Sequence, residues 1–320
     1  TVVVTAPIIF MSNDPKKSLG IGLAGFGTVG TGVWETFERN AELISNRSDV
    51  QVDIVRIAVR DLSKARIDGV SGDKFTTNWQ DVVDDADVDI VVELIGGTDT
   101  AFDIVAAALR AGKPVVTGNK ALLAERGQAL FELSKQCDTP IHFEAAVAGG
   151  IPIIKTVQDS FVGNSIQSMV GIINGTSNYI LERMTDAGLG YEEALGEAQQ
   201  LGYAEADPTL DVNGWDAAHK AILLATLAYG FTVDPDDVYV RGIERVRGTD
   251  IDFAKRLGFV VKLLCVVREH PEGVIEIRTQ PSFIPQSHIL SSVNGVFNAV
   301  AVRGDAAGDS LFYGRGAGKD

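Results

Sequence analysis

The first half of the chain alternates between short apolar runs and longer amphipathic stretches. The apolar runs predict buried strands at residues 19–24, 52–59, 89–94, 114–117 and 140–144. The amphipathic stretches have helical spacing at residues 31–43, 79–86, 101–111 and 121–136. This alternation predicts an α/β fold with a Rossmann-type, doubly wound parallel sheet.

A different pattern begins after residue 149. Helices are expected at residues 151–161, 176–187, 191–201 and 214–229. Strands are expected at residues 165–173, 260–268, 274–279 and 293–302. A group of helices followed by a group of strands indicates an α+β domain whose sheet is mainly antiparallel.

The composition fits a large two-domain protein and narrows the range of partners. With 320 residues, of which 45% are hydrophobic, the chain is long enough to bury a sizeable core. Its net charge of −15 argues against binding to nucleic acid or to an anionic membrane surface, because both need a positive patch. Residues 1–10 are apolar but too short to span a bilayer, so they are interpreted as an extension before the first strand.

The cysteines and histidines give no sign of a disulfide framework or a zinc site. Cys137 and Cys265 lie far apart in the sequence, and the four histidines show no ligand spacing. This cysteine usage favours a reducing, cytoplasmic location.

A glycine-rich turn follows the first predicted strand and precedes a helix. It consists of Gly25, Phe26, Gly27, Thr28, Val29 and Gly30. In a GxGxxG turn the first glycine permits the sharp bend, the second lets a pyrophosphate approach the backbone, and the third allows close helix–strand packing. The N-terminus of the following helix then offers free N–H groups to the phosphates. At the first strand–helix junction, this pattern predicts a dinucleotide cofactor.

The end of the second predicted strand leaves the choice of cofactor open. Arg60 at this position suits the 2′-phosphate of NADP, whereas an acid suits the ribose hydroxyls of NAD. Asp61, the next residue, is such an acid. The residues therefore indicate NADP or NAD.

Residues 198–220 concentrate acidic side chains before a single lysine. Asp216 and Lys220 are four residues apart on a predicted helix and share one of its faces. Spacing alone favours an ordinary ion pair at a helix start, worth a few tenths of a kcal/mol.

The order of residues in this segment resembles the signature of homoserine dehydrogenases. The matched pattern runs from Ala198 to Lys220 and includes Gly-Tyr-Ala, Asp-Pro and Asp-Val in family order. Four other segments agree with the family: GFGTVG, VTGNKALLA, FEAAVAGGIPII and GIINGTSNYIL. The similarity extends from about residue 19 to the last residue.

The resemblance implies specific roles for several of these residues. Lys220 is expected to be the proton donor and acceptor at the substrate oxygen, with Lys120 as its partner. Glu205, Asp216 and the backbone around Gly202 are expected to hold the substrate. Hydride transfer to an aldehyde carbon builds negative charge on its oxygen, and nearby ammonium groups stabilise that charge and supply the proton.

The resemblance also implies a monovalent-cation loop. A sodium or potassium ion is expected on the side chain of Glu144 and the backbone carbonyls of Val147, Gly149 and Ile151. From the residues alone the same segment is a glycine-rich hinge, and both interpretations stay open. Two further positions, Thr98 and Gly318, correspond to cofactor contacts in the family.

For the whole chain, the resemblance implies an NAD(P)-dependent enzyme that interconverts L-aspartate 4-semialdehyde and L-homoserine in threonine, methionine and isoleucine biosynthesis. Residues 18–150 are expected to bind the dinucleotide, residues 151–310 to bind substrate, catalyse and dimerise, and residues 311–320 to return to the first domain. A homodimer or larger homo-oligomer is expected, with residues 282–302 as a candidate interface. In the family a further helix follows the final glycine-rich segment, so the sequence looks truncated after Asp320.

Two alternatives stay open. One is another two-domain NAD(P)-dependent amino-acid or semialdehyde dehydrogenase; a phosphorylating one needs a cysteine nucleophile, and neither Cys137 nor Cys265 lies in a suitable segment. The other is a non-catalytic NAD(P) sensor, which would not need the two lysines and two acids together.

Overall fold

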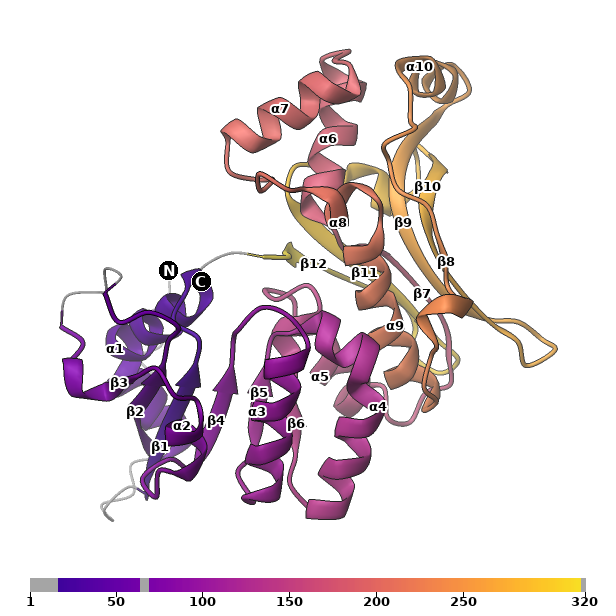
Figure 1. The fold of residues 1–320 in the computed structure, drawn as a ribbon. Helices are drawn as coiled ribbons and strands as arrows, with labels where there is room; N and C mark the ends of the chain where they lie inside the picture. The colour runs from indigo at the N-terminus through magenta and orange to yellow at the C-terminus, as the bar shows by residue number, and fades with distance from the viewer. Residues whose placement is uncertain (1–16, 64–68, 318–320) are drawn as a thin grey trace, which may run out of the picture. The chain divides into compact units, whose positions relative to one another are not determined.

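The computed structural model describes residues 17–63 and 69–317, and these residues form two compact units (Figure 1). The first unit contains the described residues up to Thr117 together with Ala129–His142. The second contains Gly118–Gln128 and the described residues from Phe143 onward. The position expected to contact the cofactor near the C-terminus, Gly318, lies outside the described residues.

The first unit is built on a parallel sheet with the strand order β3-β2-β1-β4-β5-β6. The strands are β1 (Lys17–Ala24), β2 (Val50–Ala58), β3 (Phe75–Thr76), β4 (Ile90–Glu93), β5 (Val115–Thr117) and β6 (Ile141–His142). The helices are α1 (Thr28–Ser48), α2 (Gln80–Asp84) and α3 (Asp99–Arg110), with a short 3₁₀ turn, η1 (Gly72–Lys74). Helix α4 (Lys120–Cys137) is divided: its residues up to Gln128 belong to the second unit and those from Ala129 onward to the first. The strand order is that of dinucleotide-binding sheets, and it confirms the predicted fold class.

Apolar strand residues and the first helix form the core of this unit. Leu23 and Ile57 are fully buried in neighbouring strands, and Trp34 of α1 packs against the same cluster. Burying one such aliphatic side chain is worth about 1.5–3 kcal/mol. This explains why the apolar runs of the sequence predicted the strands of a parallel sheet, which is covered on both faces.

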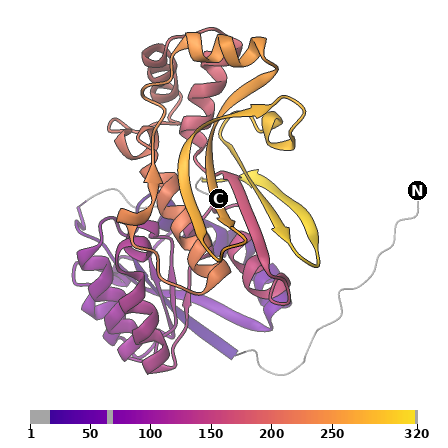
Figure 2. The ribbon, with the colours of Figure 1, turned by 90° about the vertical axis from the view of Figure 1, so that its right-hand side faces the viewer.

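The second unit contains a six-stranded sheet with the order β12-β11-β7-β9-β10-β8. The strands are β7 (Ile166–Ile172), β8 (Tyr239–Val240), β9 (Phe259–Glu269), β10 (Ile275–Pro285), β11 (Phe297–Gly304) and β12 (Gly308–Arg315). Every pairing is antiparallel except that of β8 with β10, as expected for the α+β domain. Figure 2 shows the β11–β12 hairpin in yellow beside β7.

The second unit also contains helices, some of which pack on this sheet and carry the polar residues of interest. They are α5 (Ile153–Lys155) with the π turn η3 (Thr156–Ser160), α6 (Gly175–Asp186), α7 (Tyr191–Gln200), α8 (Thr209–Val212), α9 (Trp215–Tyr229) and α10 (Gly248–Arg256). Shorter 3₁₀ turns are η2 (Glu144–Ala146), η4 (Pro235–Asp237) and η5 (Ile289–Ser292). Helix α9 contacts β9 and β10, and α6 contacts both β9 and α7 (Figure 1).

Helix α9 is buried from Asp216 through Ala225. Its start is fixed by Gly214, which has a φ of +91° and lies so close to the backbone of Arg241 that a Cβ atom would be 3.3 Å from its carbonyl oxygen. Gly230, at a φ of +72°, ends the helix. The apolar length of α9 thereby places its first turn, with its charged residues, inside the unit.

The structure differs from the expected domain layout in two places. Residues 311–315 do not return to the first unit, because β12 pairs along its whole length with β11 of the second sheet. Residues 118–128 and 143–150, which were expected in the first domain, group with the second unit. Within the described part of the chain, no helix has the length and apolar character needed to cross a membrane.

Candidate active site

Two lysine side chains meet on one carboxylate in the second unit. Lys120, the first residue of α4, places Nζ 3.0 Å from Oδ1 of Asp216. Lys220, one turn after Asp216 on α9, places Nζ 2.7 Å from Oδ2 of the same carboxylate. We call Lys120, Asp216 and Lys220 the lysine–aspartate cluster. The structure thus brings together the two predicted catalytic lysines.

Two members of the cluster are buried, whereas the Lys120 side chain is 36% exposed, and the cluster has further polar neighbours. Asp216 is 7% exposed and Lys220 is 9% exposed. Lys220 Nζ also donates to the carbonyl oxygen of Ile173, at 2.7 Å. The side-chain amide of Asn174 donates to Oδ2 of Asp216, at 2.8 Å, and to Oδ1 of Asp211, at 2.7 Å.

Opposing effects set the ionisation of the two acids. Burial alone would raise the pKa of Asp216. The charges of Lys220 and Lys120, together with the hydrogen bonds from Lys220 and Asn174, lower this pKa by more than burial raises it, so it lies well below the ordinary value. Burial and the neighbouring charge of Asp216 raise the pKa of Asp211 above the ordinary value. Asp216 is therefore a permanent anion between the two lysines.

Two further titratable groups near the cluster, His219 and Cys265, are neutral. Burial lowers the pKa of His219, which lies on α9 between Asp216 and Lys220 in sequence, and the imidazole is uncharged near pH 7. Burial raises the pKa of Cys265 on β9 to about 12, so its thiol is protonated. Such a thiol is unsuited to act as a nucleophile, which argues against the phosphorylating semialdehyde dehydrogenase.

The glycine turn of the first unit has the geometry that a dinucleotide needs. Gly25 has a φ of +108°, and a Cβ atom there would be 2.6 Å from the carbonyl oxygen of Leu94. At Gly30 a Cβ atom would be 2.3 Å from the carbonyl oxygen of Gly25, so only glycine lets α1 pack this closely. Gly27, in contrast, has no protein atom within 4 Å of the Cβ position. The middle glycine therefore leaves open space at the start of α1, where the first-turn N–H groups of Thr28 and Val29 lie.

The other described residues expected to contact the cofactor from the strand and helix ends also lie in the first unit. Arg60 is exposed just after β2. Asp61 Oδ1 accepts hydrogen bonds from the backbone N–H and the hydroxyl of Ser63, at 2.9 and 2.7 Å. Thr98 is the N-cap residue of α3. Phe26 packs edge-on against Phe75.

The expected substrate-binding loop is less closely tied to the cluster than Asp216. Gly202 has a φ of +74°, a conformation that favours glycine. Glu205 is exposed, and its backbone carbonyl accepts a hydrogen bond from the side chain of Gln199, at 3.1 Å. Among the contacts of the described residues, none joins the Glu205 carboxylate to the cluster.

The expected cation loop contains a carboxylate that already caps a helix. Glu144 accepts hydrogen bonds from the backbone N–H groups of Ile154, at 2.9 Å, and Lys155, at 2.8 Å, through different oxygens. The described residues contain no group of three or more His, Cys, Asp or Glu side chains that could hold a metal ion. Because a carboxylate oxygen has two lone pairs, the oxygens of Glu144 can accept these bonds and still coordinate a cation with nearby carbonyls.

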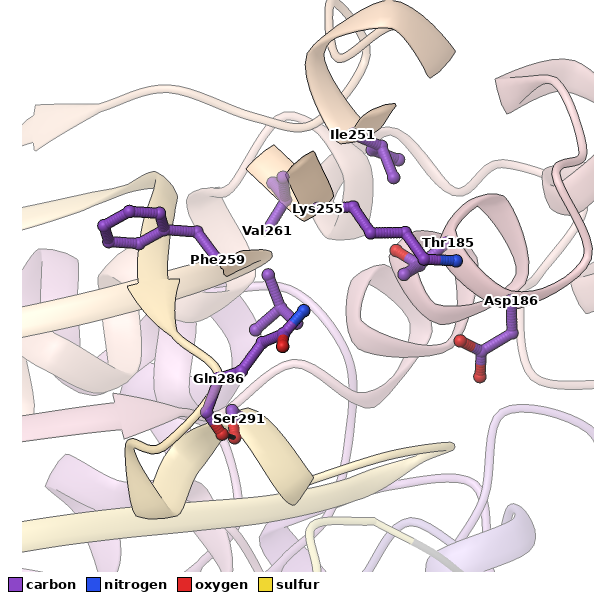
Figure 3. Close-up of a pocket in the computed structure, with 9 residues that line it drawn as sticks. Thr185, Asp186, Ile251, Lys255, Phe259, Val261, Gln286 and Ser291 are labelled. Atoms are coloured by element: carbon purple, nitrogen blue, oxygen red, sulfur yellow. Dashed lines mark hydrogen bonds between the residues drawn. The ribbon is translucent and has the colours of Figure 1, made fainter. Parts of the chain in front are cut away.

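The second unit also contains a pocket of about 190 Å³ that lies apart from the cluster (Figure 3). Apolar side chains such as Ile251 and Phe259 line it together with the charged Asp186 and Lys255. The lining includes no residue of the lysine–aspartate cluster.

Two residues at the cluster were not predicted from the sequence. Asp211 is one of the acidic residues of segment 198–220 and received no role, and Asn174 lies in the quoted segment GIINGTSNYIL. The signal for Asn174 was local: an Asn three residues before a Ser at a helix start is a typical N-cap. Nothing in the spacing indicated that its amide reaches acids 37 and 42 residues away.

A parallel sheet with this strand order and this glycine turn is a dinucleotide-binding fold. Paired ammonium groups on a buried carboxylate suit the reduction of a carbonyl by a nicotinamide cofactor. The protein is therefore an NAD(P)-dependent oxidoreductase. Residues 152–320 match the family model for homoserine dehydrogenase, and residues 25–144 match that for the homoserine dehydrogenase NAD binding domain. The chain belongs to the homoserine dehydrogenase family, which confirms the resemblance found in the sequence.

Curated relatives and solved structures agree with this assignment. The chain is 43% identical over 318 residues to the homoserine dehydrogenase of Corynebacterium glutamicum, covering 98% of this chain and 71% of the relative. It is 44% identical to that of Bacillus subtilis, covering 94% of this chain and 70% of the relative. A crystal structure of the enzyme from Thiobacillus denitrificans superposes with a TM-score of 0.90 at 46% identity, over 94% of this chain and 70% of that one. A hyperthermophilic archaeal homoserine dehydrogenase in complex with NADPH has a TM-score of 0.79 at 26% identity, covering 94% of this chain and 92% of that one.

Proposed function

We propose that the lysine–aspartate cluster carries the proton transfer when this enzyme interconverts L-homoserine and L-aspartate 4-semialdehyde. The bound cofactor supplies one function, the acceptance or donation of hydride at the substrate carbon. In oxidation the substrate C–H bond breaks as hydride, the O–H proton passes to the neutral amine of Lys220, and the C=O bond forms. Reduction reverses these steps. The observation that carries this proposal is the meeting of two ammonium groups on one buried carboxylate.

The hydrogen bonds of Lys220 leave one donor for the substrate. An ammonium group has three N–H donors, and Lys220 uses two of them for Ile173 and Asp216. We assign the third to the substrate oxygen. Lys120 adds a second positive charge, which stabilises the developing alkoxide.

Asp216 and Glu205 have different parts in this proposal. The carboxylate of Asp216 accepts hydrogen bonds from Lys120, Lys220 and Asn174, so its first role is to orient both lysines. The same two oxygens also contact the substrate ammonium group in this proposal. Glu205 is exposed on the loop after α7 and is free to meet the substrate ammonium together with the backbone at Gly202. A Glu205→Gln change is expected to raise the KM for homoserine with little change in kcat, and an unchanged KM would contradict this role.

The residues after β2 favour NADP over NAD. Asp61 is held by Ser63, whereas the Arg60 guanidinium is exposed and able to pair with a 2′-phosphate. Arg60→Ala is expected to raise the KM for NADP roughly tenfold or more and to leave the KM for NAD unchanged. Equal effects on both cofactors would remove the basis for this preference.

Three finer assignments follow the family resemblance. A sodium or potassium ion is proposed on Glu144 and the carbonyls of Val147, Gly149 and Ile151, and Thr98 is proposed as a cofactor contact. A homodimer is proposed through residues 282–302, which size-exclusion chromatography with light scattering would test. A cytoplasmic location is proposed, which the two free thiols at Cys137 and Cys265 suit. A role in the biosynthesis of threonine, methionine and isoleucine is proposed from the family resemblance.

The test compares two buried lysines of the second unit. Lys220→Met removes the proposed proton carrier, and Lys262→Met removes a lysine that is 4% exposed and bonded to Val293 and Asn294. The rate of homoserine oxidation, followed by the absorbance of the reduced cofactor, is expected to fall roughly 10²- to 10⁴-fold for Lys220→Met and to stay unchanged for Lys262→Met. Cofactor binding, followed by fluorescence, should persist in both variants. Full turnover in folded Lys220→Met, or a wild-type preference for a different hydroxy acid, would overturn the proposal.

A further inference from the structure

The side chain of Asn174 joins two carboxylates at the cluster. Its Nδ2 donates to Asp211 and Asp216, and its Oδ1 accepts from the backbone N–H of Ser177, at 2.7 Å. The residue is 4% exposed. Both donors and the acceptor of the amide are therefore used. This pattern defines its orientation, because a flipped amide would point its oxygen at two carboxylates.

The backbone on either side of Asn174 is held in place. The carbonyl oxygen of Ile173 accepts from Lys220, and a Cβ atom at Gly175 would be 2.7 Å from the carbonyl oxygen of Val296. The hydroxyl of Ser177 donates to the backbone oxygen of Asp211, at 2.7 Å. The first turn of α6 thus binds Asp211 at both its backbone and its side chain.

Two carboxylates and two ammonium groups lie close together around Asn174. Asp211 from α8 and Asp216 from α9 face the ammonium groups of Lys120 from α4 and Lys220 from α9. Burial and Asp216 raise the pKa of Asp211, and the hydrogen bond from Asn174 lowers it. The remaining neighbours, His219 and the Cys265 thiol, are uncharged, and Glu125 of α4 acts on His219.

We propose that Asn174 is a positioning residue for the reaction: its amide holds Asp211 and Asp216 together, so that the Asp216 carboxylate stays fixed between Lys120 and Lys220. This role rests on the proposed function, since it acts through Lys220. The amide supplies two donors without adding charge, which neither a carboxylate nor a hydroxyl can do at this position.

Two substitutions separate this role from the helix cap. Asn174→Ser and Asn174→Asp both keep an oxygen that accepts from Ser177, and both are good N-cap residues. Serine removes the bridge between the acids, and aspartate replaces it with a third carboxylate. The matched control is Asn178→Ser, because Asn178 is fully buried on the same helix but contacts Val293, Gly295 and Lys262 instead of the cluster.

The kinetic readouts are kcat for homoserine oxidation and its pH profile. Asn174→Ser is expected to lower kcat roughly 10- to 100-fold, with the KM for the cofactor unchanged. Asn174→Asp is expected to lower kcat and to shift its pH profile toward higher pH, because a third carboxylate beside Asp211 and Asp216 adds negative charge at the cluster. Asn178→Ser should lower the melting temperature without moving the pH profile.

Three outcomes would overturn the role of Asn174. The first is a folded Asn174→Ser or Asn174→Asp protein with wild-type kcat and pH profile. The second is an Asn178→Ser control that loses as much kcat, and shifts its pH profile as far, as the Asn174 variants do. The third is failure of both Asn174 variants to fold, which would make Asn174 a residue of the fold alone. Lys220→Met separates these results from failure of the proposed function: if that variant keeps full turnover, the proton assignment itself is wrong.

Discussion

Replacing Asp216 with Asn is the most direct perturbation of the lysine–aspartate cluster. The change keeps the shape of the side chain but removes the negative charge that lies 2.7 Å from Lys220 and 3.0 Å from Lys120. Two ammonium groups are then left beside the partly buried Asp211, without the carboxylate that pairs with both of them. We expect the folded protein to lose stability and turnover together.

The size of the stability loss follows from the burial of the pair. Unit charges about 4 Å apart attract by roughly 4 kcal/mol at an effective dielectric constant near 20. Part of this attraction is offset by the desolvation of the carboxylate, which is several kcal/mol for a buried ion. Removing one partner of a buried pair therefore costs about 3–5 kcal/mol, and the loss is smaller where a lysine escapes by releasing its proton.

The pH dependence has a defined sign. The pKa of Asp216 is lower in the folded chain than in the unfolded chain, so its stabilisation is fully present above the unfolded value of about 3.9 and is lost as the pH falls through the folded value. The difference between wild type and Asp216→Asn should be constant from about pH 5 to pH 7.

Urea unfolding at pH 5, 7 and 9, at equal protein concentration, measures this difference. The matched control is Asp309→Asn, whose carboxylate pairs with Arg303 on the surface of the same unit, with both side chains more than half exposed. An exposed pair of this kind is worth about 0–1 kcal/mol. If Asp216→Asn costs no more than Asp309→Asn, the two lysines do not depend on Asp216 and the electrostatic reasoning is refuted.

Four further substitutions test other parts of the molecule. Burial lowers the pKa of Lys262 to about 8, below its value in the unfolded chain. Between pH 7.5 and 9.5 the wild-type protein should therefore gain roughly 2 kcal/mol of stability relative to Lys262→Met in urea unfolding. A difference that does not change with pH would contradict this. Gly27→Ala should weaken cofactor binding at an unchanged melting temperature, because its methyl group meets only open space, whereas Gly30→Ala should lower both; equal melting temperatures would contradict the packing role of Gly30. Glu144→Gln should remove any stabilisation by sodium or potassium chloride relative to choline chloride in thermal unfolding; an unchanged salt response would place the cation elsewhere.

The sequence predicted the fold of the first unit well because its signals are local. Apolar runs produced the strands, and the glycine turn contains its own steric requirements at Gly25 and Gly30. The destination of the last described strand was not local. Residues 311–315, which were expected to return to the first unit, lie in β12 and pair with β11 of the second sheet.

The site was predictable only as far as residue identity carried it. Lys120 and Lys220 are one hundred residues apart, and only the resemblance to the family joined them before the structure placed both on Asp216. The spacing of Asp216 and Lys220 alone favoured a weak surface pair. It underestimated the pair because periodicity does not show that α9 is buried through its first turn.

The burial of this ion pair is itself an argument for function. Replacing a buried ion pair with well-packed apolar residues is often neutral or stabilising, so a buried pair is weak support for a role in the fold. Helix α9 is otherwise rich in Ala and Leu, and apolar residues at positions 216 and 220 would suit its surroundings. The desolvation of Asp216 and Lys220 is therefore a cost to stability that a purely structural helix has no need to bear. A reaction that uses a fixed ammonium group shielded from water requires this desolvation. The buried pair therefore favours a proton carrier at Lys220 over a passive nucleotide sensor.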